Sequence, residues 1–240
     1  MKKTSLFIFI AAVATISVVS CKQKETPFVP YIDATVTFRP AEGGRYFLKQ
    51  DDTTALIVKN TGFEEYPFPD GKEKRALITY SVNQKSTESV PGFKTTYDVH
   101  LYRIDTIYTK KPVVLKAGED PDSYGDAPIG LYIDKDLFPT TMIEDGYLCV
   151  MFEMPMSNIG ITHKINLLRG TDPEDPYTLE LHHDMCGDAA VFSQAYLVNF
   201  PLKDLPDTEG KTVKLTLKWY SLATLKDESV TFDYKSRTDW

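Results

Sequence analysis

Apolar and polar residues alternate along much of this chain with a period of two. This spacing places one face of a β-strand in a core and the other face in water. The pattern is clearest in residues 212–220, TVKLTLKWY, where four apolar side chains alternate with threonine and lysine. Residues 177–183, YTLELHH, and alternate positions of 230–234 follow the same period. These segments are therefore predicted to be strands with one buried face.

Shorter strand signals fill the rest of the chain, and no amphipathic helix is indicated. Turn residues separate them, as in Pro69-Asp70-Gly71, because Gly, Asn and Asp tolerate the backbone conformations that a reversal needs. In the first half the predicted strands are 34–39, 45–49, 55–59, 75–82 and 97–108. In the second half they are 147–154, 163–168, 177–183, 195–200, 212–220 and 230–234. We therefore predict an all-β protein.

An acidic segment divides these strands into two groups. In residues 117–128, acidic residues, Pro and Gly replace aromatic and β-branched residues, which is typical of a linker. We predict a small OB-type Greek-key barrel over residues 31–116, the acidic linker over 117–128 and an immunoglobulin-like β-sandwich over 129–240. A single continuous β-sandwich is the alternative.

The first residues follow a different pattern. Lys2 and Lys3 precede an apolar run over 6–19, which is too short to span and hold a bilayer and ends at Ser20-Cys21. This pattern indicates a secretory signal over residues 1–20 and resembles the bacterial lipoprotein signal. That resemblance implies that Cys21 carries the lipid and that residues 21–30 form a tether. An ordinary secreted protein with a cysteine near its cleavage site is the alternative.

Charge narrows the choice of partners. Removal of residues 1–20 takes away two lysines, so the net charge falls from -7 to -9. An acidic surface disfavours binding to nucleic acid and to anionic lipid headgroups, so the lipid on Cys21 must supply the membrane contact. Each buried methylene of an acyl chain contributes about 0.8 kcal/mol, and two or three chains hold firmly. The mature protein is expected to be tethered to a membrane through Cys21.

Two thiols remain once Cys21 carries the lipid. In an oxidising compartment Cys149 and Cys186 are candidates for a disulfide. The alternative is two separate thiols, because free cysteine packs as a small apolar residue. Cys149 lies in the apolar run 147–152 and Cys186 follows the end of a predicted strand, so both interpretations stay open.

His182, His183 and Asp184 form the densest group of candidate metal ligands, with Cys186 close by. A zinc site needs three or four ligands that converge on one point. Neighbouring residues of a strand point to opposite faces, so the two histidines cannot share a metal without a bulge. His183 is in phase with the apolar positions of 177–183, which favours a partly buried histidine at the end of a strand. No cofactor is predicted.

Aromatic residues are concentrated in the first half, and OB-type barrels bind oligosaccharides or oligonucleotides on one face. Tyr66, Phe68, Tyr97 and Tyr102 are candidates for such a ligand face. Packing within the sheet is the favoured interpretation, because strands are rich in aromatic residues.

The sequence contains no Gly-x-Ser-x-Gly elbow and no cysteine with the helical or basic support that would activate a nucleophile. We therefore predict no catalytic residues and no enzymatic activity. A hydrolase with an unrecognised site stays an alternative, because a pair of carboxylates in a cleft leaves no sequence signature.

Several segments together resemble the NigD-like family of Bacteroidetes lipoproteins. They are Cys21 after its signal, Pro69-Asp70-Gly71 with residues 75–78, and above all residues 177–184, YTLELHHD, with 198–202 and 215–219 downstream. The resemblance implies an N-terminal OB-type barrel and a C-terminal β-sandwich. It implies no catalytic or binding residues, and the association of the family name with bacteriocin genes makes immunity or secretion a conceivable role.

The combined expectation is a non-enzymatic lipoprotein that acts as a binding or assembly module in the cell envelope. Its expected partners are the membrane, through Cys21, and an envelope protein or a glycan. A glycan-binding accessory of a polysaccharide system and a hydrolase are the alternatives. Residues 22–25, KQKE, contain only one acid, whereas surface lipoproteins of this group tend to carry an acidic patch after the cysteine. We therefore expect an outer-membrane anchor that faces the periplasm.

Overall fold

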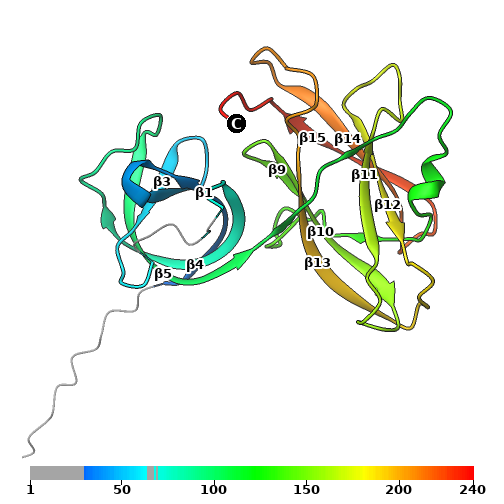
Figure 1. Cartoon of the computed structure of the whole chain (residues 1–240), viewed down its shortest axis with the longest axis horizontal. Coiled ribbons are helices and arrows are strands. Elements are labelled where there is room, and N and C mark those ends of the chain that lie inside the picture. The colour runs from blue at the N-terminus through cyan, green and yellow to red at the C-terminus, as the bar shows by residue number, and fades with distance from the viewer. Residues whose placement is uncertain (1–29, 64–67, 69) are drawn as a thin grey trace, which may run out of the picture. The chain divides into compact units, whose positions relative to one another are not determined.

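A computed structural model describes residues 30–63, 68 and 70–240 of the chain. Apart from two short 3-10 helices, all regular elements in this part are β-strands (Figure 1). The prediction of an all-β protein is confirmed. The lipoprotein signal, Cys21 and Tyr66 lie outside the described residues. Within them, no helix has the length and apolar character needed to cross a membrane.

The first five strands close into a barrel in the order β1-β2-β3-β5-β4. β1 pairs antiparallel with both β2 and β4, while β3 and β5 run parallel. The short 3-10 helix η1, Glu42–Gly44, connects β1 to β2. These strands are β1 (Ile32–Pro40), β2 (Tyr46–Lys49), β3 (Thr54–Val58), β4 (Lys74–Lys85) and β5 (Thr95–Thr106). The predicted OB-type barrel is therefore present.

Apolar residues at alternate positions fill the barrel. Val36 and Phe38 of β1 meet Leu48, Leu56 and Ile78 from the other strands, and each of these side chains is buried. The burial of five such side chains, at about 1.5 to 3 kcal/mol each, supplies a large favourable term for folding. The alternation of apolar and polar residues in the barrel strands therefore reflects burial of one face in the barrel core.

Two further sheets pack face to face and form the predicted β-sandwich. The first has the order β6-β13-β10-β8, with β9 also paired to β10, and the second has the order β15-β14-β12-β11-β7. The first sheet contains β6 (Tyr108–Thr109), β8 (Gly130–Leu131), β9 (Met142–Glu144), β10 (Tyr147–Met156) and β13 (Phe192–Pro201). The second contains β7 (Val113–Val114), β11 (Lys164–Arg169), β12 (Thr178–Asp184), β14 (Val213–Tyr220) and β15 (Asp227–Tyr234).

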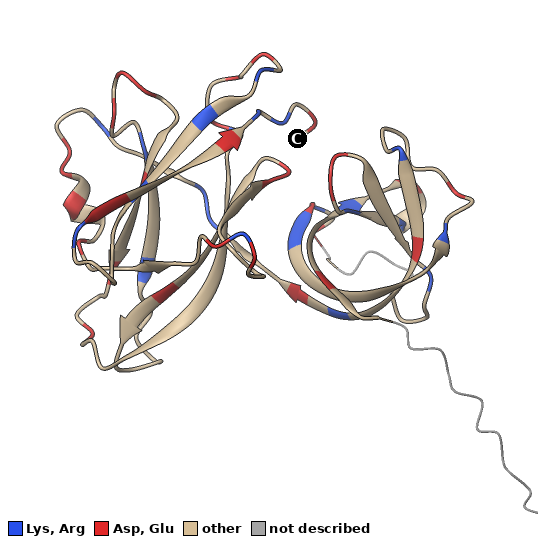
Figure 2. Ribbon diagram, turned by 180° about the vertical axis from the view of Figure 1, so that it is seen from behind, with Lys and Arg blue, Asp and Glu red and all other residues tan. Residues whose placement is uncertain are grey.

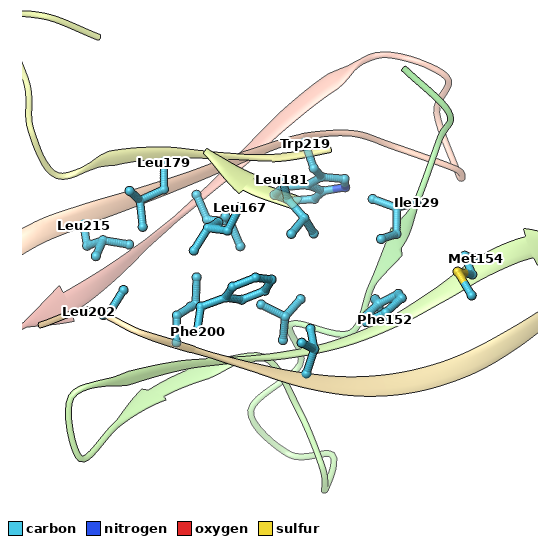
Figure 3. Close-up of a cluster of buried hydrophobic side chains, with 14 of the residues drawn as sticks. Ile129, Phe152, Met154, Leu167, Leu179, Leu181, Phe200, Leu202, Leu215 and Trp219 are labelled. Carbon is cyan, nitrogen blue, oxygen red and sulfur yellow. The ribbon is translucent and has the colours of Figure 1, made fainter. Parts of the chain in front are cut away.

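The core of the sandwich lies between these sheets (Figure 3). Phe152 and Phe200 of the first sheet face Leu181, Leu217 and Trp219 of the second, and all five are buried. The alternation of residues 212–220 therefore places its apolar face in this core, as predicted.

The change from barrel to sandwich comes earlier in the chain than predicted. Residues 108–109 and 113–114, assigned to the barrel from the sequence, pair instead with β13 and β11 of the sandwich. The predicted linker is also folded onto the sandwich. It contains the 3-10 helix η2, Pro121–Tyr124. The carbonyl of Tyr124, the last residue of η2, accepts a hydrogen bond from the side chain of Asn166 in β11 at 2.7 Å. A strand signal shows that a segment is extended, but not which sheet accepts it.

A buried ionic network joins β1 and β2 to the turn between β9 and β10. Asp145 in this turn accepts hydrogen bonds from Thr37 and Lys49, both at 2.5 Å, and from Arg39 at 3.0 Å. Next to it, the fully buried Arg75 donates to Glu144. These partners explain why β1 is buried on both faces, with apolar residues inside the barrel and threonines against the turn.

Candidate functional site

A cleft of about 790 Å³ opens between the acidic segment 120–127 and the ends of β12, β14 and β15. The acidic segment passes over the end of β12, where Ala127 donates its backbone N–H to the carbonyl of His183 at 3.0 Å. Ile129 then donates to the carbonyl of Tyr220 at the end of β14 at 2.9 Å. The segment predicted to be a linker therefore forms one wall of a cleft.

Gly125 sets the position of this wall. Its φ of +119° lies in the region that favours glycine, and a Cβ at this position would lie 2.3 Å from the carbonyl carbon of His183. Asp120 caps the neighbouring helix η2 by accepting a hydrogen bond from the backbone of Asp122 at 3.1 Å. Only glycine allows the backbone to approach β12 so closely, so the wall depends on this residue.

Carboxylates dominate the lining of the cleft. Its only lysine is Lys218, and His182 is the other basic side chain. The acidic lining residues are Asp120, Asp122, Asp126, Glu180, Asp227 and Glu228. Figure 2 colours the ribbon red at acidic residues and blue at lysines and arginines. Walls that carry mostly one sign of charge concentrate oppositely charged ligands, so the electrostatics of the cleft favour a cation.

His182 lies on the cleft side of β12 and has a partner on each ring nitrogen. Nδ1 lies 2.7 Å from the carbonyl oxygen of Gly125, and Nε2 lies 3.5 Å from a carboxylate oxygen of Glu180. Burial lowers the pKa of His182, but the contacts with Glu180 and Gly125 outweigh burial, so the pKa is raised. The hydrogen bond from His182 also lowers the pKa of Glu180. The contact with Glu180 therefore favours the protonated form of His182.

His183 points to the other face of β12, as its phase in the sequence predicted, and is 1% exposed. Its Nδ1 lies 3.1 Å from the carbonyl oxygen of Pro128, and its Nε2 lies 2.8 Å from Nδ1 of His163. Nε2 of His163 in turn lies 3.1 Å from the carboxylate of Asp188. Ser157 donates both its backbone N–H and its hydroxyl to that carboxylate.

The hydrogen-bond partners of His183 and His163 limit where the hydrogens of the two rings can lie. The carbonyl of Pro128 and the carboxylate of Asp188 are acceptors, so the nitrogen that faces each of them must carry a hydrogen. The contact between His183 and His163 needs a third hydrogen, whereas two neutral imidazoles carry only two. All three contacts are satisfied as hydrogen bonds when one of the two rings is protonated beside the carboxylate of Asp188. Burial lowers the pKa of His183.

The candidate metal ligands do not converge. His182 and His183 lie on opposite faces of β12, as their spacing predicted, and Asp184 pairs with Lys164 at 3.1 Å and accepts from the backbone of Cys186 at 2.8 Å. No group of three His, Cys, Asp or Glu side chains in the described residues is arranged to hold a metal ion. The structure thus places His182 in the cleft and His183 in the buried pair with His163.

The two cysteines are free. Cys149 is buried in β10, where burial raises the pKa of its thiol to about 12. Cys186 is exposed in the turn after β12. Of the two alternatives left open by the sequence, the structure has the separate thiols.

The candidate ligand-face aromatics do not form one surface. Phe68 packs edge-on against Phe38 in the barrel core at a centroid distance of 5.3 Å, and Tyr97 is partly buried against the same core. Tyr102 is 44% exposed and contacts the ring of Tyr31 at 4.7 Å. Tyr66 lies outside the described residues, so packing accounts for two of the four.

Several residues of the cleft were missed from the sequence. Tyr220 and Asp227 face each other across β14 and β15, and Trp219 lines the inner end of the cleft. The alternation of 212–220 places Tyr220 on the outer face, but nothing in the sequence shows that segment 120–127 returns to cover it.

Comparisons with known proteins found one matching family and several solved structures with a similar fold. The profile of the family described as NigD-like C-terminal beta sandwich domain matches residues 112–234. A solved structure of a protein named as toxin-related, from Parabacteroides distasonis, is 29% identical with a TM-score of 0.67, covering 86% of this chain and 94% of its own. No match was found among curated proteins.

Two more distant structures share the fold. A protein of unknown function from Bacteroides vulgatus is 22% identical with a TM-score of 0.65, over 85% of this chain and 91% of its own. A NigD-like immunity protein from Bacteroides caccae is 19% identical with a TM-score of 0.52, over 88% of this chain and 100% of its own. At these identities the likeness concerns the fold alone.

Proposed function

The chain belongs to the family of the NigD-like C-terminal β-sandwich domain, and we propose that it is a lipid-anchored binding module of the cell envelope. In this proposal Cys21 anchors the protein to the outer membrane on its periplasmic side. The acidic cleft then holds a positively charged segment of a partner protein. The observation that carries the proposal is the charge of the cleft, where six carboxylates face one lysine and one histidine.

The state of the polar groups in the cleft supports binding over catalysis. A general base needs a free nitrogen near the substrate, and a glycosidase needs a protonated carboxyl group with a raised pKa. Both ring nitrogens of His182 are already occupied by partners, and the pKa of Glu180 is lowered. These two groups therefore position segment 120–127 and contribute charge.

The test is a titration of the full-length lipidated chain in nanodiscs with a decalysine peptide, with deca-glutamate as the control ligand. Asp126 and Asp227 are exposed and line the cleft, so Asp126→Asn/Asp227→Asn removes two charges without cutting a buried contact. Exposed ion pairs contribute about 0.2 to 1 kcal/mol each, so Kd should rise about tenfold. The matched control, Glu42→Gln/Asp105→Asn, changes two carboxylates of the barrel.

Equal weakening by both double variants would show that net charge, and not the cleft, governs binding. Absence of decalysine binding would refute the proposal for the cleft. The toxin-related name of the P. distasonis protein, which is 29% identical, makes a protein toxin the first natural partner to test.

A glycan is the second candidate ligand. Tyr220 is 37% exposed and lies across the strand pair from Asp227, so an aromatic face and a hydroxyl-accepting carboxylate stand side by side in the cleft. Titration against a panel of soluble glycans tests this candidate. Binding that Tyr220→Ala abolishes, and that Asp126→Asn alone leaves intact, would favour the glycan over the basic segment.

The anchor needs its own test. Metabolic labelling with a fatty acid should mark the wild-type protein and leave Cys21→Ser unlabelled. Protease treatment of intact cells should leave a periplasm-facing protein whole and degrade it only after the outer membrane is opened. Rapid loss of the protein from intact cells would refute the periplasmic orientation.

A further inference from the structure

Strand β13 has an open edge. On one side it pairs with β10 along its whole length, from Phe192 to Pro201. On the other side, among the described strands, only β6 pairs with it, at Val198 and Asn199. The part before β6 is exposed, including Val191 at 75% and Phe192 at 44% of their surface. This open edge, residues 191–197, is available to another strand.

The backbone groups of Ser193 and Ala195 point outward along this edge. Lys110, which follows β6, donates its N–H to the carbonyl of Asn199 at 2.9 Å, so the backbone groups of Asn199 point away from β10. Residues two and four positions apart in a strand point the same way. Ser193 and Ala195 lie six and four positions before Asn199, so their N–H and C=O groups face the open edge.

The open edge is uncharged, in contrast to the edge on the second sheet. Residues 191–197 read VFSQAYL and contain neither a charged residue nor a proline. The edge strand β15 carries Asp227, Glu228 and Asp233. Charges and prolines are the usual protection of an exposed edge against strand pairing, and the open edge of β13 has neither.

We propose that the open edge binds a second copy of this chain, with the two β13 strands antiparallel about a twofold axis at Gln194. In this register Ser193 lies opposite Ala195 of the second copy, and each exchanges two hydrogen bonds with its counterpart. Within the described part of the chain these backbone groups have no strand partner, so the register uses four such groups per chain. Registers centred further along the strand collide with β6.

The side chains of this register are self-complementary. Phe192 lies opposite Tyr196 of the second copy on one face, while Val191 precedes β13 and donates its N–H to the carbonyl of Met156 at 3.1 Å. Aromatic cross-strand pairs stabilise antiparallel sheets. The mature chain carries a net charge of -9, so two copies approach with least repulsion along a segment that carries no charge. A second copy therefore fits the edge in backbone, shape and charge.

Cysteine cross-linking tests the register directly. Gln194 lies opposite itself in a pair without hydrogen bonds, where the Cα atoms are about 4.5 Å apart, within the range of a disulfide. Full-length lipidated Gln194→Cys, with Cys186→Ser to remove the exposed native thiol, is oxidised mildly in vesicles. A band of twice the mass is expected on a non-reducing gel. Thr231→Cys, exposed on the edge strand β15, is the matched control and should stay monomeric.

Two further variants separate edge pairing from chance collision in the membrane. In the Gln194→Cys background, Ser193→Lys/Ala195→Lys places like charges opposite each other across the twofold axis and should slow cross-linking at least tenfold. Ser193→Lys/Ala195→Glu places opposite charges there and should restore it. Circular dichroism confirms that both variants fold. The proposal would be overturned if the Lys/Lys and Lys/Glu variants cross-link equally. It would also be overturned if Gln194→Cys cross-links no more than Thr231→Cys, or does not cross-link at all.

Discussion

Asp145 holds the junction of barrel and sandwich, and Asp145→Asn is the sharpest test of that role. Its side chain is 2% exposed and accepts hydrogen bonds from Thr37, Arg39 and Lys49 of the barrel. Nε of Arg237, near the C-terminus, lies 3.5 Å from the same carboxylate. Asparagine keeps the shape of the side chain and removes its charge, so three cations lose their central partner.

The magnitude follows from burial. The side chains of Arg39, Lys49 and Arg237 are 13%, 9% and 5% exposed, so water cannot replace the lost carboxylate. Removal of one partner from a buried ion pair costs about 3 to 5 kcal/mol. Glu73 and Asp239 also pair with Arg237 and reduce that cost, so we expect the free energy of unfolding to fall by about 3 kcal/mol. With a urea m-value of about 2.5 kcal/mol/M, the unfolding midpoint should fall by about 1.2 M.

Tryptophan fluorescence during urea unfolding is a suitable assay. Trp240 packs against Tyr147 at a centroid distance of 5.3 Å, next to the network, while Trp219 reports on the sandwich core. Asp239→Asn is the matched control, because its carboxylate pairs with the same arginines but is 58% exposed. Its midpoint should fall by less than about 0.4 M, since exposed pairs contribute about 1 kcal/mol or less.

The effect should also depend on pH in one direction. Burial raises the pKa of Asp145, but the hydrogen bonds from Lys49 and Thr37 outweigh burial, so the pKa is lowered in the folded protein. A lowered carboxyl pKa adds stability above the unfolded value near 4, and that stability is lost as pH falls through the folded pKa. The gap between wild type and Asp145→Asn should therefore shrink below pH ~4. An equal midpoint shift for both Asn variants, or a gap independent of pH, would refute the reasoning.

The remaining predictions concern the cleft wall, the histidine pair and the thiols. Gly125→Ala should lower the free energy of unfolding by about 3 kcal/mol in urea titrations, because the new Cβ meets the His183 backbone at a strained φ; a loss below ~1 kcal/mol would contradict this. Burial lowers the pKa of His183 in the folded protein. The contribution of neutral His183 to the free energy of unfolding is therefore full above pH ~6.5 and is lost as pH falls towards the folded pKa. Between pH 7.5 and pH 5, Tm should fall less in His183→Asn than in wild type. A thiol reagent should label Cys186 in the folded chain and Cys149 only after unfolding, and equal rates would show that Cys149 is accessible.

The strands were predictable because their cause is local. Residues 177–183 and 212–220 alternate in sequence, and each strand buries the apolar set in the core. Residues 108–114 carry strand signals too, but pairing with β13 and β11 is decided by distant residues. The buried Arg75 had no sequence signal, since its carboxylate partner is 69 residues away.

The candidate site was predictable only in pieces. The opposite orientations of His182 and His183 followed from the period of a strand, and both were placed correctly. The acidic residues of 117–128 were recognised as a group, but their folding onto the end of β12 depends on the close approach of Gly125, which the sequence does not announce. A cleft formed by three strands and a loop exists only once the tertiary fold is complete.

The two neighbouring histidines have one more consequence. His182 contacts the carbonyl of Gly125 from the cleft side, and His183 contacts that of Pro128 from the core side. When His182 loses its proton, the tautomer with hydrogen on Nδ1 keeps the bond to Gly125, and only the attraction to Glu180 is lost. A rise in pH thus makes the cleft more negative by one unit without moving its wall. In this molecule, the charge of the cleft can be changed by the medium while the geometry of the cleft stays constant.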